Sequence, residues 1–300
     1  MKKRPFIESV IRWLVLIAGY GYLIYRLVHF DGYETLFANT TQHSVGQFVA
    51  LLLCVGMMVL NYMLEACKWQ VLLVGEGTLR FAQAWKEVLY GNIGAFVTPY
   101  RAGDIPSRLL QLPESVSRPH ALVLGLYGGV IQTVVIVVAG MVPTLLFLER
   151  QEWSYLTWLL ITGTVAVALV VWLRREPRAR WLHLTSKQYL QLFAACTARY
   201  LCWIGQLVLV MLFLGIDLTP EMLLLGLPTY YLLVTVTPNM PVADAGIRGS
   251  WAVFVLSRYG VEAPLAAAAA IGLWFINTVL PLLLYPLTLK MTQTKAATKP

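Results

Sequence analysis

Residues 97–108 of the chain read VTPYRAGDIPSR, and residues 236–248 read VTPNMPVADAGIR. Both stretches contain Val-Thr-Pro, then an aspartate, then an arginine four residues after that aspartate. The two copies lie about 140 residues apart, close to half the length of the 300-residue chain. A motif that recurs at this distance predicts two similar halves, each of which contains one copy.

Each of these stretches follows or ends an apolar segment that is too short to cross a bilayer. The two segments are Val88–Pro99 and Met222–Pro238, whereas a spanning helix needs about 20 apolar residues. We therefore predict two re-entrant hairpins, which are tolerated at membrane depth where protein or a cavity satisfies the backbone. The residues expected to break the helices are Thr98, Pro99, Thr237 and Pro238.

Six other segments are long and apolar enough to span the bilayer. They are Val10–Phe30, Gln47–Ala66, His120–Leu148, Trp153–Leu173, Tyr189–Leu214 and Ala263–Leu287. Each half then contains two spans, a re-entrant hairpin and one further span. Because three crossings is an odd number, the second half is inverted relative to the first, and such paired broken segments indicate the binding site of a transporter.

The predicted fold class is therefore an all-α integral membrane protein. It has six transmembrane helices plus two re-entrant hairpins in an inverted 3+3 repeat. Residues 1–300 form a single transmembrane domain, with repeat one at about 1–150 and repeat two at about 151–300. Because the motif, the offset and the order of spans agree, the repeat is more than a chance match of three residues.

The distribution of basic residues orients the spans. The chain has 23 Lys and Arg residues, and most of them fall in segments that lie inside when the N-terminus is cytoplasmic. The loop Asp31–Gly46, which then lies outside, contains no Lys or Arg. By the positive-inside rule, we predict a multi-pass protein of the cell (inner) membrane with both termini in the cytoplasm.

Composition argues against several other classes of protein. Hydrophobic residues make up 58% of the chain and charged residues 13%, whereas about a quarter of the residues in soluble domains are charged. The basic residues lie in short patches between apolar runs, which argues against nucleic-acid binding. P-loop, HExxH and GxSxG motifs are absent from the sequence, and no Cys/His cluster has the spacing of a metal site. We therefore expect no catalytic residues, no cofactor and no metal ion.

Two aspartate–arginine pairs are the first candidate binding residues. Asp104 and Arg108 are four residues apart, as are Asp244 and Arg248, so each pair lies on one face of a helix. One interpretation is a local salt bridge that neutralises both charges near the interface. The other is that each arginine presents its guanidinium group to an anionic headgroup while the aspartate holds the arginine in position. The recurrence of the pair in both halves favours the second interpretation.

Other charged residues lie in or beside the apolar segments. Arg199 is about ten residues into a predicted span, where a charge costs about 2.5–3.5 kcal/mol and usually faces an interior cavity. Arg101, just before Asp104, is a further candidate for binding phosphate. Glu65 and Lys68 end the second predicted span, where they either pair at the interface or line an inner vestibule.

The first broken segment resembles a motif of one known family. Asn92-Ile93-Gly94, then Thr98 to Asp104, then Arg108 resemble the pattern of the lysylphosphatidylglycerol synthase transmembrane-region family. That pattern is a TP followed by R-x-G-E and a later arginine. Asp104 stands where the family usually has Glu, which conserves the charge.

Two other elements of the sequence are similar to the same family. Lys68-Trp69 with Leu72-Leu73 resembles its basic-Trp-x-x-Leu-Leu ending to an early helix. Pro238 to Arg248 resembles its proline- and glycine-rich element, although Gly249 stands where a Glu usually follows. The resemblance implies a polytopic domain that moves lipids with charged headgroups between leaflets. Because the sequence ends at Pro300 without the aminoacyltransferase domain of two-part members, we expect translocation rather than synthesis.

The motifs and the resemblance together predict a flippase-like lipid translocator. The headgroup of a phospholipid or lipid-linked substrate would enter a polar cavity between the two hairpins while its tails stay in the bilayer. The expected substrate-binding residues are Arg101, Asp104, Arg108, Arg199, Asp244 and Arg248, with the arginines on phosphate. Two alternatives remain open: a membrane enzyme acting on a lipid-linked substrate, and a non-catalytic partner subunit of a lipid-modifying enzyme. The expected partners are membrane lipids with charged headgroups, with a second copy of the chain or a partner enzyme as further candidates.

Overall fold

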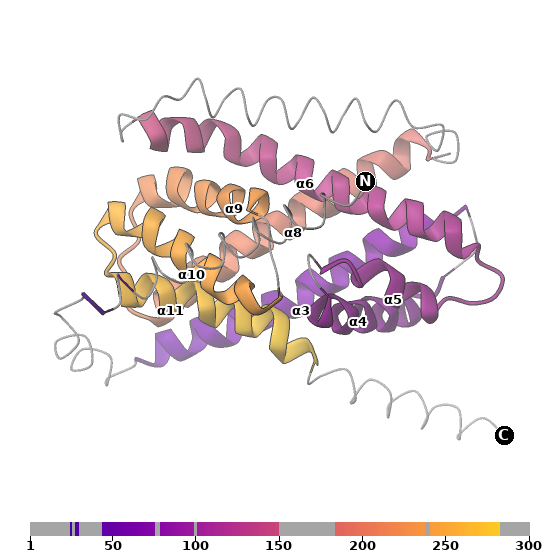
Figure 1. Ribbon diagram of the computed structural model, residues 1–300, viewed down its shortest axis with the longest axis horizontal. Coiled ribbons are helices and arrows are strands. Elements are labelled where there is room, and N and C mark those ends of the chain that lie inside the picture. Colours follow the sequence, from indigo (N-terminus) through magenta and orange to yellow (C-terminus); the bar gives the residue numbers. More distant parts are fainter. Residues whose placement is uncertain are drawn as a thin grey trace, which may run out of the picture. The chain divides into compact units, whose positions relative to one another are not determined.

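The computed structural model describes residues 25, 28–29, 44–75, 79–98, 101–149, 184–237 and 241–282. Within these ranges all regular structure is helical and no strand occurs. The α-helices labelled in Figure 1 are α3 (Val45–Leu73), α4 (Phe81–Val97), α5 (Asp104–Leu110), α6 (Arg118–Glu149), α8 (Ser186–Phe213), α9 (Leu227–Val236), α10 (Pro241–Leu256) and α11 (Ala263–Trp274). Short π- and 3-10-helical segments are η3 (Met222–Gly226), η4 (Ser257–Tyr259) and η5 (Phe275–Val279).

Four helices are long and apolar enough to cross a bilayer. They are α3, α6, α8 and the helix Ala263–Leu282, which contains α11 and η5. These helices match four of the six predicted spans. The predicted spans Val10–Phe30 and Trp153–Leu173 lie outside the described residues, apart from Tyr25, Val28 and His29. The all-helical class is therefore confirmed for the part of the chain that the structure describes.

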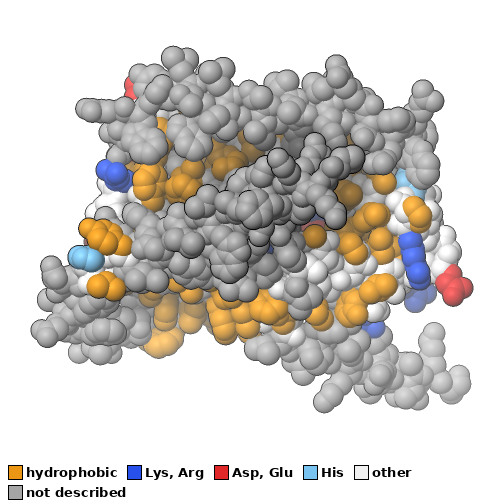
Figure 2. Space-filling view, viewed as in Figure 1, with side chains coloured by type: hydrophobic (Ala, Val, Ile, Leu, Met, Phe, Trp, Pro, Cys, Tyr) orange, Lys and Arg blue, Asp and Glu red, His pale blue; other side chains and the backbone are white. Residues whose placement is uncertain are grey.

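Apolar side chains on these helices face outward. Leu52 of α3, Val138 of α6 and Leu190 of α8 are 71%, 63% and 69% exposed. Figure 2 shows apolar side chains over much of the visible described surface. Because large apolar surfaces of this kind are costly in water, they are suited to contact with lipid chains.

Helix α3 continues beyond the predicted end of its span. The prediction ended this span at Ala66 because Glu65 and Lys68 introduce charge, but the helix runs on to Leu73. Both charged residues are buried, and the apolar Trp69 and Leu72 follow them on the same helix. The charges therefore lie within the protein, where only protein partners can compensate for the lost hydration.

The two predicted hairpin segments both form helices that end early. Helix α4 has 17 residues and rises about 26 Å, and Met222–Val236 rises about 23 Å, against a hydrocarbon core of about 30 Å. Each helix ends at a threonine in extended conformation, Thr98 (φ −116°, ψ 142°) and Thr237 (φ −77°, ψ 126°). A proline follows each threonine in the sequence, and the residue before proline is restricted to this extended region.

The described residues belong to two compact units. Unit 1 contains residues 25, 28–29, 44–56, 139–149, 204–237 and 241–274, and unit 2 contains residues 57–75, 79–98, 101–138, 184–203 and 275–282. In unit 1, α10 packs against α9 and α11, and in unit 2, α4 packs against α5. Each unit thus takes residues from both halves of the chain.

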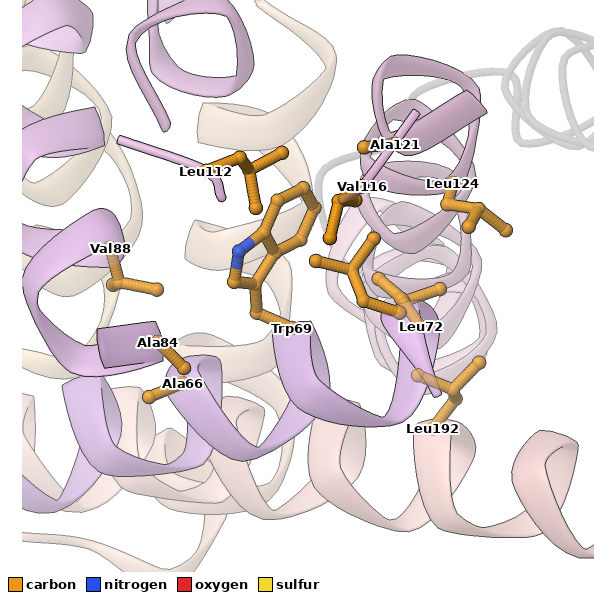
Figure 3. Packing of buried hydrophobic residues seen from close by; sticks show 11 residues of the cluster. Ala66, Trp69, Leu72, Ala84, Val88, Leu112, Val116, Ala121, Leu124 and Leu192 are labelled. Carbon is orange, nitrogen blue, oxygen red and sulfur yellow. The ribbon is translucent and has the colours of Figure 1, made fainter. Parts of the chain in front are cut away.

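The apolar core of unit 2 surrounds Trp69. This side chain is fully buried, and Figure 3 shows it among side chains from several helices. The same apolar cluster contains Ala84 and Val88 of α4, Leu124 of α6 and Leu192 of α8. A buried aromatic side chain removes about 150–250 Å² of surface from solvent, so this packing fixes α3 against its neighbours. It thereby positions Glu65 and Lys68, which lie on the same helix.

Candidate functional site

Glu65 is the centre of a buried group of charges in unit 2. Its Oε1 accepts a hydrogen bond from Arg108 Nη1 at 2.8 Å. Its Oε2 forms ion pairs with Lys68 Nζ, at 2.6 Å, and with Arg199 Nη1. One carboxylate therefore joins three cations, which come from α3, α5 and α8.

Arg108 is held by a second carboxylate and by an aromatic ring. Its Nε donates to Asp104 Oδ1 at 2.8 Å, and its Cζ lies 5.5 Å from the centroid of the Trp69 ring. Burial acts to lower the pKa of Arg108, but the neighbouring Asp104 and Glu65 carboxylates raise that pKa above its ordinary value. The Arg108 side chain is only 4% exposed, and its guanidinium group remains charged inside the protein.

Arg199 is also positioned by polar side chains of α3 and α6. Its Nε donates to Asn61 Oδ1 at 2.9 Å, and its Nη1 donates to Gln132 Oε1 at 3.3 Å. The amide of Gln132 in turn donates to the backbone carbonyl of Cys196 at 3.0 Å. The Trp203 ring centroid lies 5.1 Å from Arg199 Cζ. These contacts fix the direction of the guanidinium group within the protein.

The charges in this group do not balance. We use the name Glu65 cluster for Glu65, Lys68, Asp104, Arg108 and Arg199. Three of its members are basic and two are acidic, so with all five ionised the cluster has a formal charge of +1. Because an ion removed from water loses several kcal/mol of hydration, this excess favours an anion nearby.

Arg101 adds a further cation beside the cluster. Its Nη2 donates to Asn92 Oδ1 at 3.1 Å, and Asn92 donates to the backbone carbonyl of Thr278 at 3.2 Å. Arg101 has φ 55°, which is uncommon for a residue other than glycine. Such a backbone is maintained by its surroundings and is frequent at functional sites. The exposed side chain adds positive charge at the turn between α4 and α5.

Glycines on α4 allow α5 to approach closely. A Cβ at Gly94 would collide with the Ser107 side chain and lie 2.5 Å from the carbonyl oxygen of Gly103. A Cβ at Gly91 would collide with Asp104 and lie 2.8 Å from the Arg108 side chain. The absence of side chains at these positions therefore places Arg108 within reach of Glu65.

The second aspartate–arginine pair lies in unit 1. Arg248 Nε donates to Asp244 Oδ1 at 2.6 Å, and Trp274 Nε1 donates to Asp244 Oδ2 at 2.9 Å. Burial acts to lower the pKa of Arg248, but Asp244 and the nearby Tyr230 raise it above the ordinary value. The Arg248 side chain is 26% exposed, against 4% for Arg108. This second pair is neutral and more accessible.

The two motifs agree in atomic detail. Arg108 and Arg248 each donate through Nε to the Oδ1 of the aspartate four residues earlier. The Thr98 and Thr237 hydroxyls each donate to the carbonyl four residues earlier, at 2.7 and 2.6 Å. Each threonine hydroxyl oxygen also accepts a hydrogen bond from the region that follows its helix. Gly103 N donates to Thr98 Oγ1, and Trp251 Nε1 donates to Thr237 Oγ1. Local geometry thus repeats where the sequence repeats.

The structure brings together some of the predicted site residues. Asp104, Arg108 and Arg199 meet at Glu65, and Asp244 pairs with Arg248 in the other unit. Thr98 and Thr237 end their helices as predicted, while Pro99 and Pro238 lie outside the described residues.

Glu65 and Lys68 were not among the predicted substrate-binding residues, and Asn61 and Gln132 were not identified from the sequence. Glu65 and Lys68 are 6% and 4% exposed, which does not fit a solvated pair at the interface. A signal was present in the sequence, because Asn61, Glu65 and Lys68 follow one another at helical spacing in an otherwise apolar span. Among the described residues, no three His, Cys, Asp or Glu side chains form a group that could hold a metal ion.

The helices and the buried charges define the class of protein. Apolar helices of spanning length that enclose a charged cluster are the structure of a multi-pass membrane protein. Residues 10–284 match the family model described as the lysylphosphatidylglycerol synthase TM region. The chain therefore belongs to this lipid-related family of membrane domains, which confirms the resemblance found in the sequence. No curated protein is significantly similar to the chain.

Proposed function

We propose that this protein is a lipid translocator, which moves a phospholipid or lipid-linked headgroup between leaflets without chemical conversion. The observation that carries the proposal is the excess positive charge of the Glu65 cluster, in a chain of a lipid-related membrane family. A buried excess of this kind is costly when nothing compensates for it. The phosphodiester of a lipid headgroup supplies one negative charge and would balance it.

The donor groups suit a phosphate. Arg108 and Arg199 present planar guanidinium groups, which bind phosphate oxygens with more than one hydrogen bond. Lys68 adds a compact charge, and Arg101 supplies a further cation from the turn between α4 and α5. The acyl chains of the lipid would remain against apolar helix faces, such as the face of α3 that carries Leu52 or the face of α8 that carries Leu190.

Unit 1 would contribute through its own pair. Arg248 is the more exposed of the two motif arginines, and Asp244 already binds both Arg248 and Trp274. In our proposal, Arg248 contacts a phosphate at another stage of movement, and Asp244 either holds the arginine in position or contacts a cationic part of the headgroup.

The proposed architecture is the six-span inverted repeat with two re-entrant hairpins. It is supported by the early ends of α4 and α9 and by the matching bonds of Thr98 and Thr237. The proposed location is the inner membrane with cytoplasmic termini. We expect cysteines introduced into the loop 31–46 to be labelled from outside. Cysteines introduced into residues 174–187 should be labelled from inside only.

Native mass spectrometry of retained lipids tests the binding step. Replacing Arg199 by Gln leaves two cations and two carboxylates, so the cluster becomes neutral. We expect Arg199→Gln to lose most of the anionic phospholipid that the wild-type protein retains. The exposed Arg118 provides a matched control, and Arg118→Gln should retain lipid normally. Equal retention by the two variants would contradict the proposal.

A further inference from the structure

A second buried carboxyl group lies next to the Glu65 cluster. Glu87 of α4 has no exposed surface. Its Oε2 accepts a hydrogen bond from the indole Nε1 of Trp69 at 2.6 Å, and Figure 3 shows this indole nitrogen on the side of the ring toward Val88 of α4. The other oxygen, Oε1, has no hydrogen-bond partner among the described residues. Glu87 therefore differs from Glu65 and Asp104, which both accept bonds from arginine.

The charged group that acts on Glu87 is Arg108. Helix α5 contributes Arg108, α3 contributes the neutral indole of Trp69, and its own helix contributes the amide of Gln83. Ala121 and Leu124 of α6 and Leu192 of α8 belong to the same apolar cluster as Ala84 and Val88 of α4. Burial raises the pKa of Glu87 above its ordinary value, and Trp69, Gln83 and Arg108 act in the opposite direction. An ionised carboxylate with so few donors is costly, whereas the neutral acid is not.

Trp69 connects this carboxyl group to the cluster. Its N–H binds Glu87, and the centroid of the same ring lies 5.5 Å from the guanidinium carbon of Arg108. The positive charge of Arg108, a member of the cluster, therefore opposes protonation of Glu87. An anion bound at the cluster would cancel part of that field and make the carboxyl group bind a proton more tightly.

We infer that Glu87 is a proton-binding site linked to the anion at the Glu65 cluster, so that the translocator takes up a proton with an anionic headgroup. This inference rests on the proposed function. Without the anion, the positive charge of Arg108 favours the Glu87 carboxylate. On arrival of the anion, the carboxylate takes one proton from hydronium in the surrounding water, so that one O–H bond forms at Glu87 and one O–H bond of hydronium breaks; the proton returns to water when the anion leaves. No other bond forms or breaks.

The sign of the resulting pH dependence follows from reciprocity. If the anion favours the protonated carboxyl group, protonation must favour the anion by the same factor. Affinity for the anion is therefore high below the pKa of Glu87 and falls as pH rises through it. A shift of about one pH unit in that pKa on binding corresponds to about a tenfold change in affinity.

Infrared titration of the purified full chain tests the inference. The carboxylic-acid carbonyl band is followed against pH with and without short-chain phosphatidylglycerol, and separately with inorganic phosphate. We expect a band that titrates in the wild type and in Glu114→Gln, an exposed control, but that is missing from Glu87→Gln. The midpoint should rise by about one pH unit with the anionic lipid, while inorganic phosphate alone should produce a smaller shift if the lipid is the ligand.

Binding measured at several pH values separates this inference from the proposed function. The wild type should bind phosphatidylglycerol about tenfold more weakly at high pH, and Glu87→Gln should bind with no such change. Lipid binding whose pH dependence is the same in both proteins would overturn the inference and leave the proposed function intact. Absence of binding at every pH would overturn both. Trp69→Phe provides a second variant if Glu87→Gln does not fold. It removes the N–H donor to Glu87, so the titration midpoint of the Glu87 band should move to higher pH.

Discussion

Arg108 Nη1 lies 2.8 Å from Glu65 Oε1, across 43 positions of the sequence. This bond joins α5, which follows the first broken segment, to a helix of spanning length. It also makes Glu65 the shared partner of three cations, since Lys68 and Arg199 bind the other oxygen. The proposed site of anion binding is built around this contact.

The charge of Glu65 should be essential for stability. In Glu65→Gln, Lys68, Arg108 and Arg199 keep Asp104 as the remaining carboxylate of the cluster, and Lys68 and Arg108 are buried. An uncompensated buried charge costs about 3–5 kcal/mol. We expect a much lower unfolding temperature in detergent than for the wild type. Glu114→Gln, at an exposed carboxylate, should melt normally. Similar melting of the two variants would mean that Glu65 does not hold the cations together.

The close contact between α4 and α5 should not tolerate a methyl group. Gly94→Ala places a Cβ against the Gly103 carbonyl, which belongs to the backbone and cannot rotate away. We expect a loss of about 1–3 kcal/mol in stability and a displaced Arg108 with weaker lipid binding. Gly56→Ala on α3 has no atom within 4 Å of the new Cβ and should be neutral or stabilising, because alanine favours helix. Normal lipid binding by Gly94→Ala would contradict the role of this contact.

The threonines that end α4 and α9 should have equivalent roles. Thr98→Val keeps the shape of the side chain but removes the acceptor for Gly103 N, and Thr237→Val removes the acceptor for Trp251. Leaving such a donor unpaired costs about 1–3 kcal/mol. We expect both variants to melt at lower temperature by similar amounts, as measured by circular dichroism. If only one variant were affected, the two motifs would not be equivalent.

The Asp244–Arg248 pair distinguishes a binding role from simple neutralisation. Replacing both residues by alanine removes two charges together and leaves neither unpaired, so a merely structural pair should tolerate the change. If Arg248 binds phosphate, both Arg248→Ala and the double variant should lose lipid movement in proteoliposomes while still folding. Full activity of the double variant would leave only a structural pair.

Local features of the fold could be predicted from the sequence because local physics determines them. Hydropathy located α3, α6, α8 and the helix Ala263–Leu282, and the Thr-Pro dipeptides located the ends of α4 and α9. The four-residue spacing of Asp104 and Arg108, and of Asp244 and Arg248, was enough to predict the two ion pairs. Each of these inferences involves residues within one helix or one turn of each other.

The composition of the Glu65 cluster could not be predicted in the same way. Arg108 and Arg199 reach Glu65 because of close packing, which depends on Gly91, Gly94 and the core around Trp69. Glu65 and Lys68 looked like the end of a span, since charge usually marks the membrane interface. Their burial depends on partners from other helices, and no local pattern in the sequence identifies those partners.

The most direct test of the central claim is lipid movement as the charge of the cluster is changed. Fluorescent anionic phospholipid is followed across proteoliposomes that contain the wild type, Arg118→Gln, Arg199→Gln, or Arg199→Gln combined with Asp104→Asn. The third protein has a neutral cluster, and the fourth regains one excess positive charge without Arg199. We expect normal movement with Arg118→Gln, loss of movement with Arg199→Gln, and partial recovery in the double variant, all with folded protein. Undiminished movement by Arg199→Gln would contradict the claim that the excess positive charge of the Glu65 cluster binds the headgroup.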